Sequence, residues 1–177
     1  LYGAVRVSIL PISLPDARLA EREHDGPNRR DVSGEHDQSP TDPQTGLRTF
    51  LFVGTAYRAN VSAVDWFVTH VFPRVSHRFI VVGSNLDRYR SRWRGVEVHG
   101  WVDDLGAYYD RADAVVIPLR TGGGMKVKTA EALMYGKPVF GTPEALRGYR
   151  HDTDGIVVCR SAHEFAERLN APDPLET

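Results

Sequence analysis

The feature that most constrains the fold of this chain is the stretch from residue 118 to residue 138, PLRTGGGMKVKTAEALMYGKP. It follows the apolar run at residues 114–117, contains three consecutive glycines at 122–124, and continues into good helix formers that Gly136 and Pro138 end. The stretch therefore predicts a strand, a glycine loop and a helix. Glycines let successive backbone N–H groups point into one concavity, and a helix start adds partial positive charge. This combination is typical of a phosphate-binding loop.

Three charged side chains follow these glycines. Lys126 and Lys128 strengthen the interpretation as an anion site, whereas Glu131, one turn deeper, suits a neutral donor such as a sugar hydroxyl. Lys128 and Glu131 are three residues apart and share a helix face. Lys126 points about 160° away from Lys128 on a helical wheel, so it can act only from the first turn. The alternative is a tight strand-to-helix turn with solvated lysines, in which Lys128 merely pairs with Glu131.

The overall composition is that of an ordinary globular protein. The chain has 177 residues, 41% hydrophobic and 25% charged, with a net charge of −1, so nothing favours binding to nucleic acid or to an anionic membrane. The single cysteine, Cys159, excludes an internal disulfide, and its apolar neighbours predict a buried small hydrophobe. No run reaches the roughly 18–20 apolar residues of a membrane span. These features predict a soluble, cytoplasmic protein.

The chain divides into three parts by composition. Residues 1–15 contain an extended, β-branched run from Val5 to Ile12 and are expected to form an arm, or the remnant of a preceding domain and its crossover. Because the chain does not begin with methionine, it is expected to be a fragment. Residues 16–46 are polar, charged and proline-containing, which predicts a linker without stable structure. Residues 47–177 are predicted to form one Rossmann-like domain. The spacing of His24 and His36 in the linker supports no metal site.

Within the third part, short apolar runs alternate with helical patterns. Helices are predicted from Val61 (with Asn60 as N-cap), at residues 125–135, and after the capping box that starts at Ser161. This alternation predicts an α/β fold with a doubly wound parallel sheet of about six strands. Ligands of such sheets bind at the carboxyl ends of the strands, where Gly54, Gly83 and Gly100 fall. The predicted strands are residues 49–53, 79–82, 96–101, 114–118, 138–142 and 156–159.

Five segments carry a family resemblance. FVGTAYRANVSAVDWF, FIVVGS, VEVHGWVDDLGAYYDRADAVVIPLR, GGGMKVKTAEALMYGKPVFGT and DGIVVC follow one another between residue 52 and about residue 171. In order and spacing they resemble the C-terminal, donor-binding domain of the glycosyl transferase group 1 family, which comprises retaining enzymes of the two-Rossmann (GT-B) architecture. The resemblance implies half of a GT-B fold and a nucleotide-diphosphate sugar as donor substrate. It implies transfer to a hydroxyl acceptor with retention, with no other cofactor and no metal.

The resemblance also implies roles for single residues. Glu131 matches the family's second glutamate, which hydrogen-bonds the ribose hydroxyls. The backbone N–H groups of Gly122, Gly123, Gly124 and Met125 would cradle the diphosphate and the donor sugar.

Further positions lie on the first loop and on the loop after the third strand. Gly54 would let the first loop approach the phosphates, and Trp101 and Val102 would contact the nucleobase. Lys128 and Glu131 are the residues expected to serve catalysis.

Two departures from the family pattern concern charge. Gly123 stands where the first glutamate of the motif is usual, so the carboxylate that contacts the donor sugar is missing. The usual Arg and Lys of the first loop are also missing, because Thr55 and residues 60–61 stand there. Candidates to supply the missing positive charge are, in order, Lys128, Lys126, Arg58 and Arg120.

The resemblance implies partners as well. An N-terminal acceptor-binding domain is expected to be absent from this chain, which alone would bind the donor weakly and catalyse nothing. Peripheral association with the inner face of a membrane would come through that missing half. Two alternatives stay open: a non-catalytic Rossmann module, favoured by Gly123, and a nucleotide-sugar epimerase of the same architecture. Asp103 and Asp104 resemble a metal-binding pair but are expected to cap a short helix.

Overall fold

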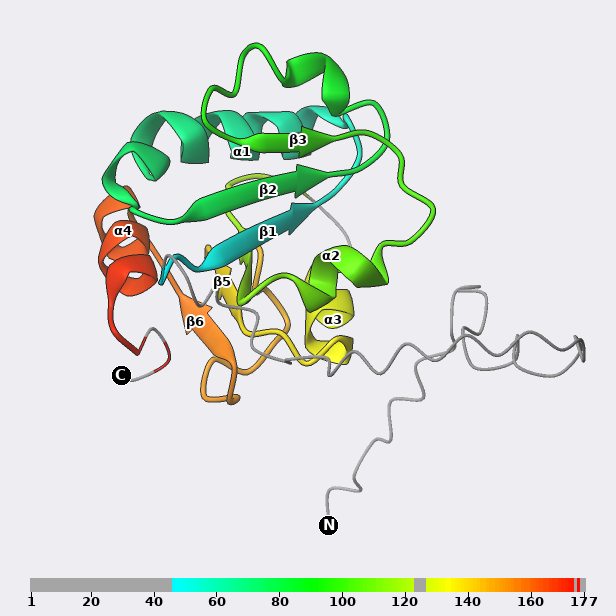
Figure 1. The fold of residues 1–177 in the computed structure, drawn as a ribbon. Coiled ribbons are helices and arrows are strands. Elements are labelled where there is room, and N and C mark those ends of the chain that lie inside the picture. The colour runs from blue at the N-terminus through cyan, green and yellow to red at the C-terminus, as the bar shows by residue number, and fades with distance from the viewer. Residues whose placement is uncertain (1–45, 123–126, 174, 176–177) are drawn as a thin grey trace, which may run out of the picture. The chain divides into compact units, whose positions relative to one another are not determined.

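A six-stranded parallel sheet forms the centre of the protein (Figure 1). The computed structural model describes residues 46–122, 127–173 and 175; the predicted arm and nearly all of the predicted linker lie outside these residues. The strand order is β3-β2-β1-β4-β5-β6, which confirms the predicted doubly wound sheet. The strands are β1 (Thr49–Val53), β2 (Arg78–Val82), β3 (Glu97–His99), β4 (Ala114–Ile117), β5 (Val139–Gly141) and β6 (Ile156–Val158).

Helices cover both faces of this sheet. Along β1, Phe50 and Phe52 pack on the side of α1 and α4, whereas Leu51 packs on the side of α2 and α3. Strands β1, β4 and β5 lie within the sheet and are covered on both faces, so their sequences are largely apolar runs. The helices are α1 (Arg58–His70), α2 (Gly106–Asp110), α3 (Val127–Met134) and α4 (Ala162–Asn170), with short 3₁₀ turns η1 (Phe72–Arg74) and η2 (Asp87–Tyr89).

Aromatic rings join α1 and α4 to the sheet. The Phe67 ring of α1 lies 4.7 Å from that of Phe79 on β2 and 5.9 Å from that of Phe165 on α4, measured between centroids. Such pairs contribute roughly 0.5–1.5 kcal/mol each beyond the area they bury. Cys159 lies fully buried in the same core, and burial raises the pKa of its thiol to about 12. This confirms the prediction of a buried, unreactive cysteine.

The helix starts agree with the sequence in two cases and differ in one. The Ser161 hydroxyl accepts from the Glu164 N–H at 3.1 Å, as a capping box requires. The Asp104 carboxylate accepts from the Ala107 N–H at 3.2 Å, so this acid serves the start of α2. The prediction of Asn60 as an N-cap is wrong, because α1 begins at Arg58, three residues before the predicted start, and Tyr57 occupies the N-cap position.

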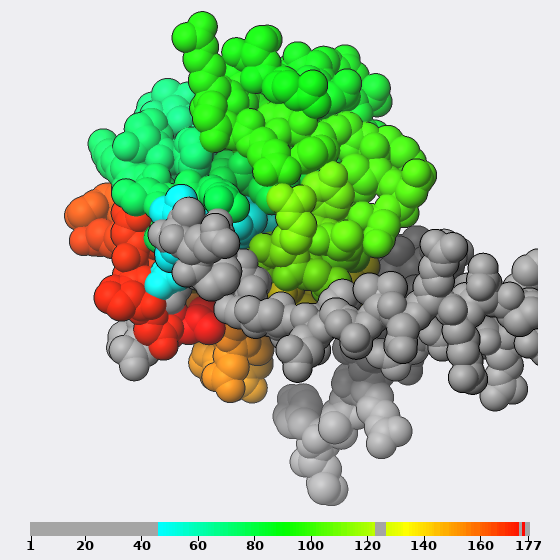
Figure 2. Space-filling model, viewed as in Figure 1, coloured from blue at the N-terminus to red at the C-terminus, as the bar shows by residue number. Residues whose placement is uncertain are grey.

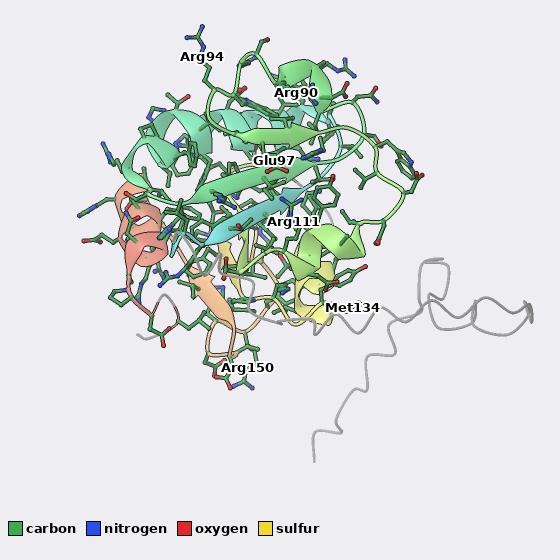
Figure 3. The ribbon with its side chains drawn as sticks, viewed as in Figure 1. Arg90, Arg94, Glu97, Arg111, Met134 and Arg150 are labelled. Carbon is green, nitrogen blue, oxygen red and sulfur yellow. The ribbon has the colours of Figure 1, made fainter. Side chains whose placement is uncertain are left out.

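The outer edge of β3 is covered by charged side chains. The Arg90 guanidinium donates from Nη2 to the Val98 carbonyl at 2.9 Å, which occupies a backbone group that another strand could otherwise pair with. Glu97 lies 3.5 Å from the Arg111 guanidinium on the face seen in Figure 3. Figure 2 shows the green residues around β3 at one end of this face and the orange residues around β6 at the other. Charged side chains therefore cover the outer edge of β3, and Arg90 occupies the Val98 carbonyl.

Candidate functional site

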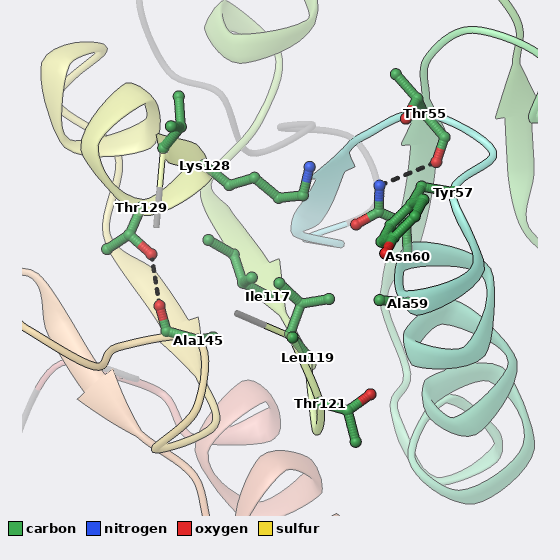
Figure 4. Close-up of a pocket in the computed structure, with 12 residues that line it drawn as sticks. Thr55, Tyr57, Ala59, Asn60, Ile117, Leu119, Thr121, Lys128, Thr129 and Ala145 are labelled. Atoms are coloured by element: carbon green, nitrogen blue, oxygen red, sulfur yellow. Dashed lines mark hydrogen bonds between the residues drawn. The ribbon is translucent and has the colours of Figure 1, made fainter. Parts of the chain in front are cut away.

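A crevice opens where the strand order reverses, between β1 and β4. It has a volume of about 300 Å³, and its wall comes from residues Thr55 to Asn60 after β1, Ile117 to Gly122 at the end of β4, and the first turn of α3 (Figure 4). The connections after β1 and β4 lead to opposite faces of the sheet, which leaves a gap at the carboxyl edge. This is the place where doubly wound sheets bind their ligands.

Lys128 crosses this crevice from α3 toward the loop after β1 (Figure 4). Its Nζ atom lies 5.8 Å from the centroid of the Phe52 ring, a cation–π distance. A Cβ atom on Gly54 would stand only 3.1 Å from the same Nζ. The missing side chain at Gly54 therefore makes room for the ammonium group.

Burial disfavours the charged form of this amino group. Burial lowers the pKa of Lys128, and the nearby Glu131 carboxylate raises it by a smaller amount. The carboxylate thus only partly offsets the cost of desolvating the charge. A phosphate entering the crevice would supply the remaining negative charge.

Two glycines bring neighbouring loops together below Lys128. The Gly54 N–H donates to the Val82 carbonyl at 2.9 Å. Gly83 has a φ of +147°, and a Cβ atom there would lie 1.5 Å from the Gly54 carbonyl oxygen. Only glycine fits at Gly83, because the backbone of the first loop occupies the space of a side chain.

Short polar side chains hold the walls of the crevice in place. The Asn60 amide, 7% exposed, donates to the Thr55 carbonyl at 2.9 Å. The Thr142 hydroxyl donates to the Leu119 carbonyl and accepts from the Ala145 N–H at 3.1 Å. These bonds hold both loops through contacts within the protein, so the walls of the crevice are preformed.

Glu131 lies beside the crevice, on the side of α2. Its half-buried carboxylate is close enough to Lys128 and to the Tyr109 phenol for electrostatic interaction. Burial raises the pKa of Glu131, and Lys128 and Tyr109 lower it by less. The spacing of Lys128 and Glu131 therefore places them together, as the sequence indicated.

Other predicted site residues do not converge on Lys128. Arg120 is exposed, with its guanidinium 5.3 Å from the Trp66 ring centroid of α1. Arg58 is also exposed and borders a separate cavity of about 320 Å³. Trp101 is 78% exposed on the loop after β3, whereas the neighbouring Val102 packs against the core on the α2 side.

The glycine loop is described only in part. Gly122 borders the crevice and has a φ of +145°, a conformation that favours glycine. Gly123, Gly124, Met125 and Lys126 lie outside the described residues.

Sequence reasoning missed two residues of the site. Asn60 was expected only as a cap, and Tyr109 was given no role. The amide of Asn60 holds the first loop, and the phenol of Tyr109 lies near enough to Glu131 to affect its pKa. For Asn60 the signal was its place in the segment that follows the first strand; for Tyr109 there was no signal.

Residues 46–122, 127–173 and 175 contain no group of three or more His, Cys, Asp or Glu side chains placed to hold a metal ion. No helix in this part of the chain has the length and apolar character to cross a bilayer. The prediction that no metal is required stays a prediction.

Comparisons with known proteins agree on family and fold. The profile of the family "Glycosyl transferases group 1" matches residues 47–171. Among solved structures, AviGT4, a glycosyltransferase involved in avilamycin A biosynthesis, is similar with a TM-score of 0.51 and 20% identity, which shows the fold alone. The similarity covers 77% of this chain and 46% of AviGT4. No curated protein shows a significant match. Because the profile covers most of its length, the chain belongs to the glycosyl transferases group 1 family.

Proposed function

We propose that this chain is the donor-binding half of a retaining glycosyltransferase that takes a nucleotide-diphosphate sugar. The observation that carries the proposal is the partly buried Lys128 side chain inside the crevice where the strand order reverses. Family membership supports glycosyl transfer. A lysine charge at a preformed crevice on the carboxyl edge of the sheet suits a diphosphate.

The donor would lie along this edge in a definite order. Its diphosphate would lie beside Lys128, with the hydroxyls of Thr55 and Thr121 and the backbone of Gly122 on the same wall. Its ribose would bind Glu131, because a carboxylate accepts strong hydrogen bonds from a neutral diol. The base would extend toward Val102.

The same geometry suggests how transfer is assisted. When the glycosyl bond breaks, negative charge develops on the β-phosphate of the leaving nucleotide. Lys128 and the backbone N–H of Gly122 would stabilise this charge more in the transition state than in the ground state. In this proposal no metal is needed. The group that orients the acceptor hydroxyl would come from a second domain, so this chain alone binds the donor weakly and without turnover.

The second candidate is a non-catalytic Rossmann module. The observation in its favour is Gly123, which stands where a sugar-binding carboxylate is usual. Such a module would bind no nucleotide, or would bind one without regard to its sugar. Release of free nucleotide, when a sugar donor and the complete enzyme are present, would decide for the transferase.

Calorimetric titration of the chain with UDP, GDP, ADP and TDP tests the donor site. At least one nucleotide should bind, and Lys128→Met should weaken it about tenfold or more, the loss expected for a charged hydrogen bond. Lys137→Met, which removes the same charge beyond the end of α3, is the matched control and should bind as the wild type does. If no nucleotide binds, or if both variants bind equally well, the proposal is wrong.

A further inference from the structure

Asn60 is a buried polar residue with only half of its amide group in use. It lies in the first turn of α1, is 7% exposed, and donates from Nδ2 to the Thr55 carbonyl at 2.9 Å. Because a carbonyl can only accept, the NH₂ group must face Thr55, and the amide oxygen must point the other way. Among residues 46–122, 127–173 and 175, no group donates a hydrogen bond to this oxygen.

The Asn60 oxygen opens into the crevice. In the described part of the chain, every side-chain nitrogen or oxygen that is closed off from solvent has a hydrogen-bond partner, so this oxygen, which has none, must be accessible. Asn60 lines the crevice, and Figure 4 shows its oxygen on the side that faces Lys128. A Cβ atom on Gly54 would stand 3.0 Å from the Asn60 Nδ2 and 3.1 Å from the Lys128 Nζ. The amide and the ammonium group therefore lie in the same part of the crevice.

A ligand of this oxygen must carry a hydrogen-bond donor. An amide oxygen only accepts, and the oxygens of an ionised diphosphate also only accept, so the two cannot bind each other. A sugar hydroxyl can donate, and inside a crevice such a bond discriminates between ligands that have the hydroxyl and ligands that lack it. The Asn60 oxygen therefore suits the carbohydrate part of a ligand and not its phosphates.

The Tyr57 ring adds a second feature that suits a sugar. Tyr57 is the N-cap residue of α1, three positions before Asn60, so the two side chains lie on the same side of the helix start. Tyr57 also borders the crevice, and it is 68% exposed. Ligand sites commonly combine an apolar ring with a few placed polar groups. A sugar ring can pack its C–H groups on the aromatic face while a hydroxyl reaches the amide.

We propose that Asn60 and Tyr57 form the glycosyl subsite of the crevice, where a hydroxyl of the donor sugar donates to the Asn60 oxygen and the sugar ring lies on Tyr57. This inference rests on the proposed function. Glu131, the proposed ribose ligand, lies on the side of α2, whereas Asn60 and Tyr57 lie at the start of α1, which covers the opposite face of the sheet. A donor whose diphosphate lies beside Lys128 thus directs its ribose to one side and its sugar to the other.

The test compares each nucleotide with its sugar conjugate. UDP, GDP, ADP and TDP are titrated calorimetrically beside UDP-glucose, GDP-mannose, ADP-glucose and TDP-glucose, and the ratio of the two dissociation constants is measured for each pair. Asn60→Ala should shift this ratio about fivefold against the conjugate, the loss expected for one hydrogen bond. Thr142→Ala is the matched control, because Thr142 is also 7% exposed and also holds a wall of the crevice, by its bond to the Leu119 carbonyl, but does not line the crevice itself. Its ratio should equal that of the wild type.

A second pair of variants tests the ring. Tyr57→Ala removes an exposed side chain and should shift the same ratio about threefold against the conjugate. Tyr57→Phe keeps the ring and should keep the ratio of the wild type.

The outcomes separate the two proposals. If Asn60→Ala only loosens the first loop, it will weaken the nucleotide and its conjugate by the same factor, and the subsite is wrong while the donor site stands. An unchanged ratio in Tyr57→Ala, or a wild type that binds a nucleotide but none of the conjugates, would also overturn the inference. If no nucleotide binds the wild type, or if Lys128→Met binds nucleotides as the wild type does, the proposed function fails and the subsite fails with it.

Discussion

Lys128 illustrates, at the scale of single residues, how a binding group can lower stability. The protein surroundings disfavour its charge, because desolvation outweighs the attraction of Glu131. Replacing it by methionine keeps the length of the side chain and removes the buried charge. Lys128→Met should therefore raise the free energy of unfolding at neutral pH by about 1 kcal/mol, while it weakens ligand binding. Urea denaturation of wild type and variant measures the change.

The same residue predicts a pH dependence. The pKa of Lys128 is lower in the folded protein than its usual value of 10.5, so the unfolded chain binds more protons between the two values. The charged lysine destabilises the folded protein by its full amount below the folded-state pKa. This destabilisation decreases as the pH rises toward 10.5. Stability of the wild type should rise in this alkaline window relative to Lys128→Met. A difference that stays constant with pH would contradict the prediction.

Alanine substitutions at Gly54 and Gly83 are expected to lower stability by different amounts. At Gly54 an added Cβ meets side-chain atoms, including the Lys128 ammonium at 3.1 Å, which can swing away. Gly54→Ala should cost about 1 kcal/mol of stability and displace Lys128 from the crevice. At Gly83 the Cβ meets backbone at 1.5 Å with φ at +147°, so Gly83→Ala should cost more than about 3 kcal/mol.

Thermal unfolding and nucleotide titration of both glycine variants check these values. Gly148→Ala provides a control, since its φ is also positive, at +92°, but a Cβ there would meet nothing within 4 Å. Gly148→Ala should lose only about 1 kcal/mol of stability, the cost of placing alanine at a positive φ. Equal losses at Gly83 and Gly148 would show that the close approach of the first loop does not matter.

Which of these residues the sequence could predict depends on how local their contacts are. Lys128 and Glu131 are three apart on one helix, so their proximity follows from helix geometry. Tyr109 is 22 positions before Glu131, and the two groups influence each other's pKa only because α2 lies beside α3. Arg120 follows the fourth strand directly, as an anion ligand would, yet it stacks on Trp66, a contact between elements that spacing does not contain.

At the scale of elements, α4 carries the best-defined cap of the chain. The Ser161 hydroxyl accepts from the Glu164 N–H, and the Glu164 carboxylate accepts from the Arg160 N–H at 2.6 Å. Ser161→Ala removes the first bond and should lower the free energy of unfolding by about 1 kcal/mol. Chemical denaturation measures it, with the exposed substitution Glu167→Gln as control. A loss no larger than that of the control would show that the cap is unimportant.

The elements themselves were largely predictable, and strands more closely than helix starts. A strand buried on both faces is a continuous apolar run, so the bounds of β1 follow from composition at Thr49–Val53. The start of α1 does not, because Asn60 is a favourable cap by propensity. In the fold its amide bonds back to the Thr55 carbonyl, and the helix begins earlier. The hydrogen bond from Asn60 to the loop thus outweighs the preference of asparagine for the N-cap position.

At the scale of the whole molecule, the alternation of strands and helices predicts a doubly wound sheet but not its order. Several strand orders satisfy right-handed crossovers and short connections. The observed order sets the reversal between β1 and β4, and only this reversal brings Thr55 and Lys128 to one crevice. The position of the site is therefore a property of the topology, and the glycine loop alone could not specify it.

Arg48 joins the two ends of the described domain. It precedes β1, yet its guanidinium donates to the carbonyls of Leu169 at 3.3 Å, Ala171 at 2.6 Å and Pro172. These acceptors lie at the end of α4 and just beyond, where carbonyl groups lack partners within the helix. A planar guanidinium with five N–H donors can serve several of them at once. Arg48 therefore fixes the last helix to the first strand.

Arg48→Met should release the end of α4 without changing the crevice. The free energy of unfolding should fall by about 2 kcal/mol, and amides in the last turn of α4 should exchange with solvent faster while those of β1 do not. Arg94→Met is the matched control, because Arg94 extends from the protein surface in Figure 3. Hydrogen exchange read by mass spectrometry resolves the two segments. Faster exchange in both segments would mean that Arg48 supports the whole sheet and not only the junction with α4. Unchanged exchange in both would mean that the packing of Phe165 and Leu169 is enough to hold the helix.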